Sequence, residues 1–225
     1  GDAQLHIHCP TMNLVLTPDG RVGGLDLQRL QGRVHELGAI FQAHLAQNLR
    51  RARIAVALDP KHGSARITAI PEDVRAAFAK RTVIGTAAAY AQAEKLGLDW
   101  NELDEPARVA MLKQGVQGDP RAAKRDDLGD RVSWQAEAAA LGYKHSSVLD
   151  TEPARPPLTR TQRLDNAYAV TLDLLEPQLD NNAVLPESRV RLAAARALIA
   201  TGIDVPSDVA AVLDIIHKRG VRQEG

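Results

Sequence analysis

The chain has 225 residues, of which 44% are hydrophobic and 25% are charged, and this composition predicts a soluble globular protein with one large core or two smaller ones. The 28 Lys and Arg residues balance the 28 Asp and Glu residues. This balance excludes a strong overall field for attracting polyanions, so any contact with nucleic acid must be made by a local patch. No segment is apolar over the roughly 18 residues that a membrane span needs, and the single cysteine cannot form an internal disulfide. We therefore expect a cytoplasmic protein that does not contact a membrane.

The first third of the sequence predicts two hairpins with a helix between them. The signals are alternating apolar residues for strands, Pro, Asp and Gly for turns, and apolar residues three and four positions apart for the helix. The expected segments are a strand over 6–16, the turn TPDG at 17–20, a returning strand over 21–27, an amphipathic helix over 27–54, and a second hairpin from 54–59 and 64–70 joined by PKHG. Gly32 and Gly38 are expected to interrupt that helix only softly.

The rest of the chain predicts helices. A helix begins at IPEDV (70–74), and others are expected over 77–96, 103–115, 126–143, 159–175, 186–201 and 206–219, with Gly97, Gly142 and Gly202 as stops and Ser207 or Asp204 as a cap for the last one. The expected fold is α+β, in which the hairpins form part of an antiparallel sheet packed by the helices over 27–54 and 70–96, followed by a mainly helical C-terminal region. We expect a first domain over 1–150, a Pro-rich linker over 151–158 and a helical region over 159–225.

Two histidines one residue apart stand out at the start of the chain, in LHIH. On a strand, His6 and His8 project from one face, roughly 6.6 Å apart. That spacing lets two imidazoles converge on one cation, although it also fits an ordinary polar strand face. A metal site needs a further ligand. The candidates are His35, His44, His62, Cys9 and a residue outside this chain.

Several motifs in order carry a family resemblance. They are DAQLHIH (2–8), GAIFQAHL (38–45), DPKHGSARI (59–67), IPEDVRAAFAKR (70–81) and WQAEAAALGY (134–143). Over roughly residues 2–150 the sequence resembles the conjugative relaxases of the MobF class, the TrwC/TraI type. The order of the motifs makes this resemblance far more specific than the two histidines alone.

The resemblance implies a DNA strand transferase. Such relaxases nick one DNA strand at a plasmid transfer origin through a tyrosine near their N-terminus. A divalent cation held by three histidines (Mg²⁺, Mn²⁺ or Zn²⁺) stabilises the charge on the scissile phosphate. His6 and His8 match two of these ligands. No position here matches the third histidine or the nucleophile, and we expect Tyr90, Tyr143 and Tyr168 to serve packing or surface roles.

We therefore expect the C-terminal part of a relaxase domain, inactive by itself and binding its metal weakly. The expected partners are transfer-origin DNA, the upstream part of the relaxase domain and, through an exposed sheet, a second copy of the chain. No GxxxxGK[ST] phosphate loop is present, so ATPase activity is not expected. The alternative function is a non-catalytic helical module that binds DNA or protein.

A basic segment is the candidate DNA contact. Lys113, Arg121, Lys124 and Arg125 lie where the resembled family has a basic DNA-contacting segment, and such side chains bind phosphates well. Three aspartates in the same segment also fit an ordinary solvated loop. A second basic cluster, NLRRAR (48–53), has the simpler explanation that it complements a helix C-terminus.

Overall fold

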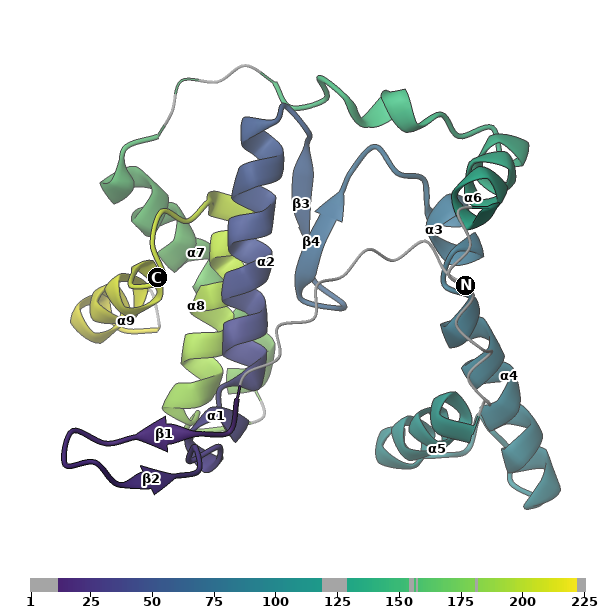
Figure 1. The fold of residues 1–225 in the computed structure, drawn as a ribbon, viewed down its shortest axis with the longest axis horizontal. Coiled ribbons are helices and arrows are strands. Elements are labelled where there is room, and N and C mark those ends of the chain that lie inside the picture. The colour runs from purple at the N-terminus through teal and green to yellow at the C-terminus, as the bar shows by residue number, and fades with distance from the viewer. Residues whose placement is uncertain (1–11, 119–128, 154–155, 157, 181, 222–225) are drawn as a thin grey trace. The chain divides into compact units, whose positions relative to one another are not determined.

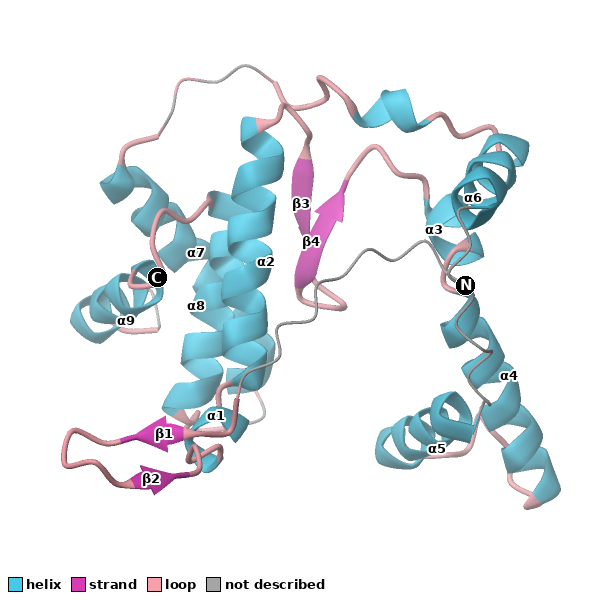
Figure 2. Cartoon of the chain, in the orientation of Figure 1, coloured by secondary structure: helices cyan, strands magenta, loops and turns pink. Residues whose placement is uncertain are grey.

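The computed structural model describes residues 12–118, 129–153, 156, 158–180 and 182–221. It contains two antiparallel hairpins among a larger number of helices, and its C-terminal region is helical (Figure 2). The α+β class predicted from the sequence is therefore confirmed. The described residues fall into two compact units: unit 1 contains Ile70–His145, and unit 2 combines Pro10–Ala69 with Ser146–Gly225.

The first hairpin pairs β1 (Val15–Leu16) with β2 (Val22–Gly23). Its turn is the predicted TPDG: Gly20 has φ +81°, and the Thr17 N–H donates to the carbonyl oxygen of Arg21 at 2.9 Å. The predicted strand from residue 6 is much shorter in the described region, because residues 12–14 are not paired as a strand. The predicted turn is confirmed, the strand predicted at residues 12–14 is wrong, and residues 6–11 lie outside the described residues.

The predicted helix over 27–54 is two helices, α1 (Gln28–Gln31) and α2 (Val34–Arg51). The chain leaves helical geometry at Arg33, whose ψ is 1°. Gly32 immediately before it lowers the cost of such a break. Gly38, by contrast, lies inside α2 without interrupting it.

The buried residues of α2 are three alanines and one charged residue, Glu36. Ala39, Ala43 and Ala46 are at most 4% exposed, and they belong to the same core cluster as three alanines of α8 (Glu187–Thr201), the helix beside α2 (Figure 1). The bulky residues that predicted an amphipathic helix lie largely elsewhere. Those that stay exposed are Leu30, Val34, Leu37, Phe41 and Leu45.

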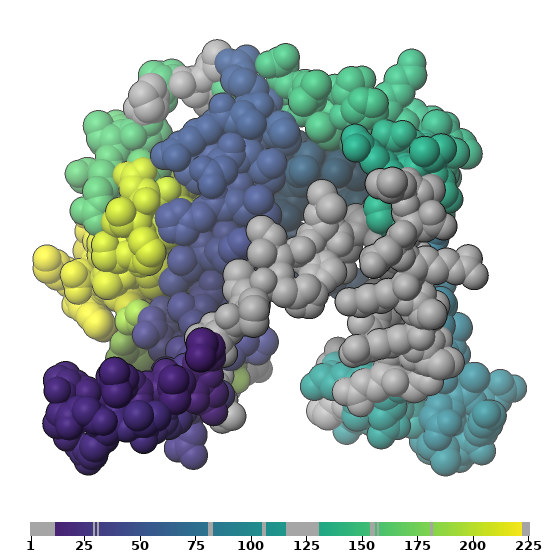
Figure 3. All heavy atoms as spheres, viewed as in Figure 1, coloured from purple at the N-terminus to yellow at the C-terminus, as the bar shows by residue number. Residues whose placement is uncertain are grey.

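The predicted helix is amphipathic, but its most buried apolar side chains are alanines, and of its bulky apolar residues Ile40 and Leu49 pack against the core. Small side chains let two helix backbones approach closely, and α8 therefore packs on the alanine side. The helical period then carries most of the larger side chains to another face, where they are exposed. Figure 3 shows α2 in blue at the surface of unit 2. We call Val34, Leu37, Phe41 and Leu45 the α2 stripe; Leu30, which is also exposed, lies on α1.

The second hairpin pairs β3 (Val56–Asp59) with β4 (Ser64–Ile67) in the register Val56 to Ile67 and Asp59 to Ser64. It packs against α2 and α8. The expectation of a single sheet is wrong for the described strands, which form two separate two-stranded sheets. The contact with α2 agrees with the expected packing by the helix over 27–54, whereas the contact with α8 was not predicted.

The C-terminal helices are α7 (Arg160–Leu179), α8 and α9 (Asp208–Arg219), and α8 contacts both of the others. A capping box between Thr159 and Gln162 begins α7. Gly202, with φ +97°, follows the last residue of α8 as predicted. These three helices, α2 and the second hairpin together form the core of unit 2.

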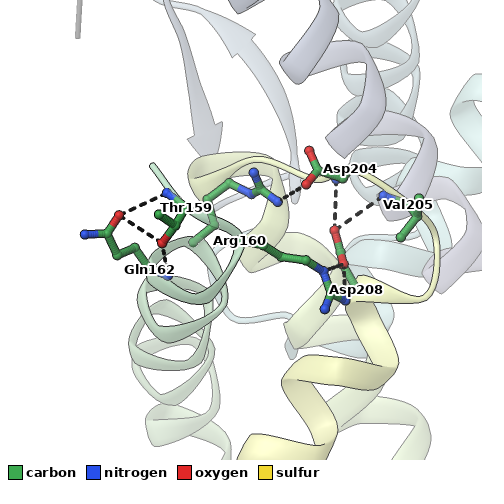
Figure 4. A network of polar contacts seen from close by, with 7 residues as sticks. Thr159, Arg160, Gln162, Asp204, Val205 and Asp208 are labelled. Atoms are coloured by element: carbon green, nitrogen blue, oxygen red, sulfur yellow. Dashed lines mark hydrogen bonds and ion pairs between the residues drawn. The ribbon is translucent and has the colours of Figure 1, made fainter. Parts of the chain in front are cut away.

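The chain enters α9 through a buried carboxylate (Figure 4). Asp208 is fully buried; it accepts from the Arg160 guanidinium at 2.7 and 3.0 Å and from the Asp204 N–H at 2.9 Å. Ser207 occupies the N-cap position but makes no capping hydrogen bond, and Asp204 pairs with Arg163. The cap predicted at Ser207 or Asp204 is therefore wrong, because Asp208 itself satisfies the N–H groups of the turn.

Unit 1 is helical in its described part. Its helices are α3 (Glu72–Ala77), α4 (Lys80–Lys95), α5 (Glu105–Gly118) and α6 (Gly129–Ala140), and η1 (His145–Val148) begins at its last residue. Gly97 and Gly142 have φ +68° and +75° and end α4 and α6, as predicted. The helix predicted from Ala77 starts later, at Lys80, because α3 ends at Ala77 and Phe78–Ala79 leave helical geometry.

The predicted linker over 151–158 contains no helix or strand where it is described. Its first residues are nevertheless tied to unit 2: the Ala55 N–H donates to Thr151 Oγ1 at 2.9 Å, and the Glu152 N–H donates to the Arg53 carbonyl at 3.0 Å. The division into domains over 1–150 and 159–225 stays a prediction.

Candidate DNA-binding and metal site

One predicted DNA-contacting residue lies in the described region. Lys113 is exposed on α5, five residues before the helix ends. Arg121, Lys124 and Arg125 follow α5 in the sequence and lie outside the described residues, as do the predicted metal ligands His6 and His8.

A glycine contact fixes the helix that carries Lys113. A Cβ added to Gly115 would collide with the carbonyl oxygen of Gly85 in α4 and would lie 3.1 Å from the Ala89 nitrogen. The backbones of α4 and α5 therefore touch at this point, and only glycine at position 115 permits it. This contact anchors α5 two residues after Lys113.

The histidines considered as a third metal ligand occupy other environments. His62 Nδ1 lies 3.1 Å from Asp59 Oδ2, and this interaction is the main reason why the pKa of Asp59 falls to about 2. His35 is exposed and His44 half-buried on α2, and Cys9 lies outside the described residues. Within the described ranges, no group of three or more His, Cys, Asp or Glu side chains could hold a metal ion.

The second basic cluster, Asn48–Arg53, has a structural role. The Arg50 guanidinium donates to the carbonyl oxygens of Val56 at 3.0 Å and Ile199 at 2.7 Å. It thus joins the end of α2 to β3 and to the last turn of α8, where carbonyl groups lack helical partners. Burial lowers the pKa of Arg50 from its ordinary value.

The tyrosines occupy packing and surface positions, as expected. Tyr168 is buried, and its hydroxyl donates to the Gly220 carbonyl at 3.0 Å. Tyr90 is exposed, and its ring centroid lies 4.4 Å from that of Trp100. Tyr143 is half-buried and lines a pocket of unit 1.

That pocket was not found from the sequence. It has a volume of about 870 Å³ and is lined by residues of α3, α6 and the segment after α6, among them Phe78, Trp134 and Tyr143. The one hint in the sequence was that aromatic residues are rare, at 3% of the chain. The sequence does not show that three of them line one pocket, because this depends on how α3 and α6 pack.

A comparison with models of known protein families identifies the family of this chain. The family model of the TrwC relaxase matches residues 1–141. The chain belongs to the TrwC relaxase family. Neither a search of curated proteins nor a search of solved structures finds a match.

Membership of the TrwC relaxase family supports a DNA-nicking function of the relaxase type. The family acts on single-stranded DNA at a transfer origin and typically uses a divalent metal ion. The matched residues span α1–α6 and include all six predicted site residues, whereas α7–α9 lie beyond the match. No described helix is long and apolar enough to cross a membrane.

Proposed function

We propose that this chain supplies two metal-ligating histidines and a DNA-contacting segment to a MobF-type relaxase that nicks DNA strand-specifically in conjugative transfer. The match of the TrwC relaxase family over residues 1–141 carries this proposal. His6 and His8 are the proposed metal ligands, and Lys113, Arg121, Lys124 and Arg125 are the proposed phosphate contacts. We do not propose that this chain supplies the tyrosine nucleophile.

The donor chemistry of His6 and His8 fits a divalent cation. Imidazole nitrogens suit Zn²⁺ and neighbouring first-row metals, and alternate positions on a strand share a face. When bound, the cation would polarise the scissile phosphate. The two histidines would hold it in place, with their neutral imidazoles as ligands.

We further propose that the third ligand and the tyrosine come from another segment of the relaxase, outside these 225 residues. The engagement of His62 with Asp59 supports this proposal, because that nitrogen already has a partner. The exposed α2 stripe supports it as well, because an upstream part of the relaxase domain would give these apolar side chains a neighbour. A second copy of the chain would be the competing neighbour.

Metal titration tests the histidine assignment. Isothermal titration of the full chain with Mn²⁺, Ni²⁺ or Zn²⁺ is expected to show weak binding, because two protein ligands leave the coordination incomplete. The double variant His6→Ala, His8→Ala is expected to lose it. His62→Ala serves as the matched control and should bind as the unaltered chain does. Undiminished binding by the double variant would rule out the proposed ligands.

The salt dependence of DNA binding tests the basic segment. Replacing Lys113, Arg121, Lys124 and Arg125 by Ala is expected to weaken binding to single strands uniformly across sequences. Because each phosphate contact contributes about 0.7 to the slope of log K against log salt, the slope should fall by up to about 3. Fluorescence anisotropy at several salt concentrations measures this slope.

The control for the charge change is a variant with Lys61 and Lys218 replaced by Ala. Both side chains are exposed and lie in unit 2. We expect this variant to keep the slope of the unaltered chain. An equal loss of slope in both variants would mean that general charge, and not the segment after α5, binds the DNA.

A further inference from the structure

The pocket of unit 1 concentrates the chain's rare aromatic side chains. The sequence has two Trp, two Phe and three Tyr, and one of each lines this pocket: Trp134, Phe78 and Tyr143. All three are half-buried, so part of each ring remains accessible. The volume of about 870 Å³ lies within the range of roughly 300–1,000 Å³ that is usual for small-ligand sites.

Local structure brings the three rings together from separate elements. Phe78 is the C-cap residue of α3, and Trp134 lies on α6. Tyr143 directly follows Gly142, whose φ of +75° turns the chain after α6. Ile70, Val74 and Ala138 add apolar side chains to the wall of the pocket.

Positive charge surrounds this apolar surface. Arg75 and Arg131 line the pocket, and none of its described lining residues carries a carboxylate. Lys80 Nζ lies 5.8 Å from the centre of the Phe78 ring. Carboxylates at the margin balance part of this charge, because Arg75 pairs with Glu72 at 2.8 Å and Lys80 pairs with Glu137 at 2.7 Å.

We infer that this pocket receives an unstacked base of single-stranded DNA, with Trp134 as the stacking platform and Arg131 contacting the adjoining phosphate. Aromatic rings beside guanidinium groups are the combination that proteins use to bind bases of single strands without sequence readout. The inference rests on the proposed function for its substrate class. It adds a base-binding position on α3 and α6, separate from the proposed phosphate contacts of Lys113 and the segment after α5.

The two tryptophans provide a matched pair of variants. Trp134 and Trp100 are both half-buried residues of unit 1, but Trp100 lies beside Tyr90 and not among the pocket residues. In the full chain, Trp134→Leu is expected to weaken binding of an oligothymidine of about ten nucleotides by about 5- to 150-fold. Trp100→Leu is expected to leave the affinity unchanged.

A second readout leaves Trp134 itself unchanged. In a Trp100→Phe chain, Trp134 is the one remaining tryptophan, and its fluorescence should be quenched by the oligothymidine. An abasic strand with the same number of phosphates should bind more weakly and leave the fluorescence unchanged. Arg131→Gln, at an exposed position, should lower the salt slope by about 0.7.

The outcomes separate this inference from the proposed function. If the oligothymidine and the abasic strand bind equally well and Trp134 fluorescence stays constant, the base pocket is refuted while DNA binding by the chain stands. If neither strand binds, the pocket and the proposed phosphate contacts both fall. Quenching that persists when the strand is abasic would also overturn the inference, since the base would then play no part.

Discussion

Replacing Ala43 by Leu is expected to lower the free energy of unfolding of unit 2 by about 1–3 kcal/mol, the usual cost of forcing extra atoms into a packed core. The side chain of Ala43 is 0% exposed and belongs to the alanine-rich core cluster that α2 shares with α8. A larger side chain must push the two helices apart along their whole contact. Urea denaturation followed by circular dichroism measures the change.

Phe41→Ala is the control for this prediction. Phe41 is two residues away on the same helix but 64% exposed. Its truncation is expected to change the free energy of unfolding by no more than about 0.5 kcal/mol. If Phe41→Ala destabilised the protein as much as Ala43→Leu, the face of α2 assigned here to the core would be the wrong one.

Glu36→Gln is expected to destabilise unit 2 near neutral pH and to have less effect in acid. Glu36 is 4% exposed, and its carboxylate accepts from Arg191 at 2.9 Å and from Arg33 at 2.9 Å. Burial raises the pKa of Glu36, but the hydrogen bonds from the two arginines outweigh burial and bring the pKa down to about 2. The charged form is therefore the one that the folded state favours.

The direction of the pH effect follows from this lowered pKa. The contribution of Glu36 to stability is fully present above its ordinary pKa of 4.5 and is lost as the pH falls toward about 2. Because Arg33 is half-exposed, we expect a loss of only about 2 kcal/mol on Glu36→Gln at pH 7. Urea midpoints at pH 7 and pH 3 measure whether the two proteins converge.

Glu187→Gln is the matched control. Glu187 also pairs with Arg191, at 3.6 Å, but its side chain is 68% exposed. We expect it to change stability by a few tenths of a kcal/mol at either pH. A Glu36→Gln effect that stayed constant from pH 7 to pH 3 would show that packing, and not charge, is what the carboxylate provides.

Short-range signals predicted the turns and the helix stops well. The turn at Thr17–Gly20, the second hairpin, and the stops at Gly97, Gly142 and Gly202 all depend on residues within a few positions of one another. The face of α2 that is buried could not be predicted in this way. Ala43 faces the core because of α8, whose own alanines lie about 150 residues further along the chain.

The candidate site could likewise be predicted only where short motifs mark its residues. His6, His8 and the basic residues were predicted from motifs, and the family match covers their positions without placing their side chains. The burial of Asp208 against Arg160 and the pocket around Trp134 depend on contacts between segments far apart in the sequence. Spacing along the sequence carries no information about such contacts, so a single sequence does not predict them.

Unit 2 combines two segments that are far apart in the sequence, and this affects how the protein folds during synthesis. Arg50 binds the carbonyl of Ile199, 149 residues later, and Glu36 binds Arg191, 155 residues later. The N-terminal half of this core must therefore leave the ribosome and wait until α8 has been made, with the alanine face of α2 uncovered. Contacts this distant in sequence are slow to form. A chain ended at Asp150 would never receive α8, so α2 would keep that face exposed to aggregation and proteolysis.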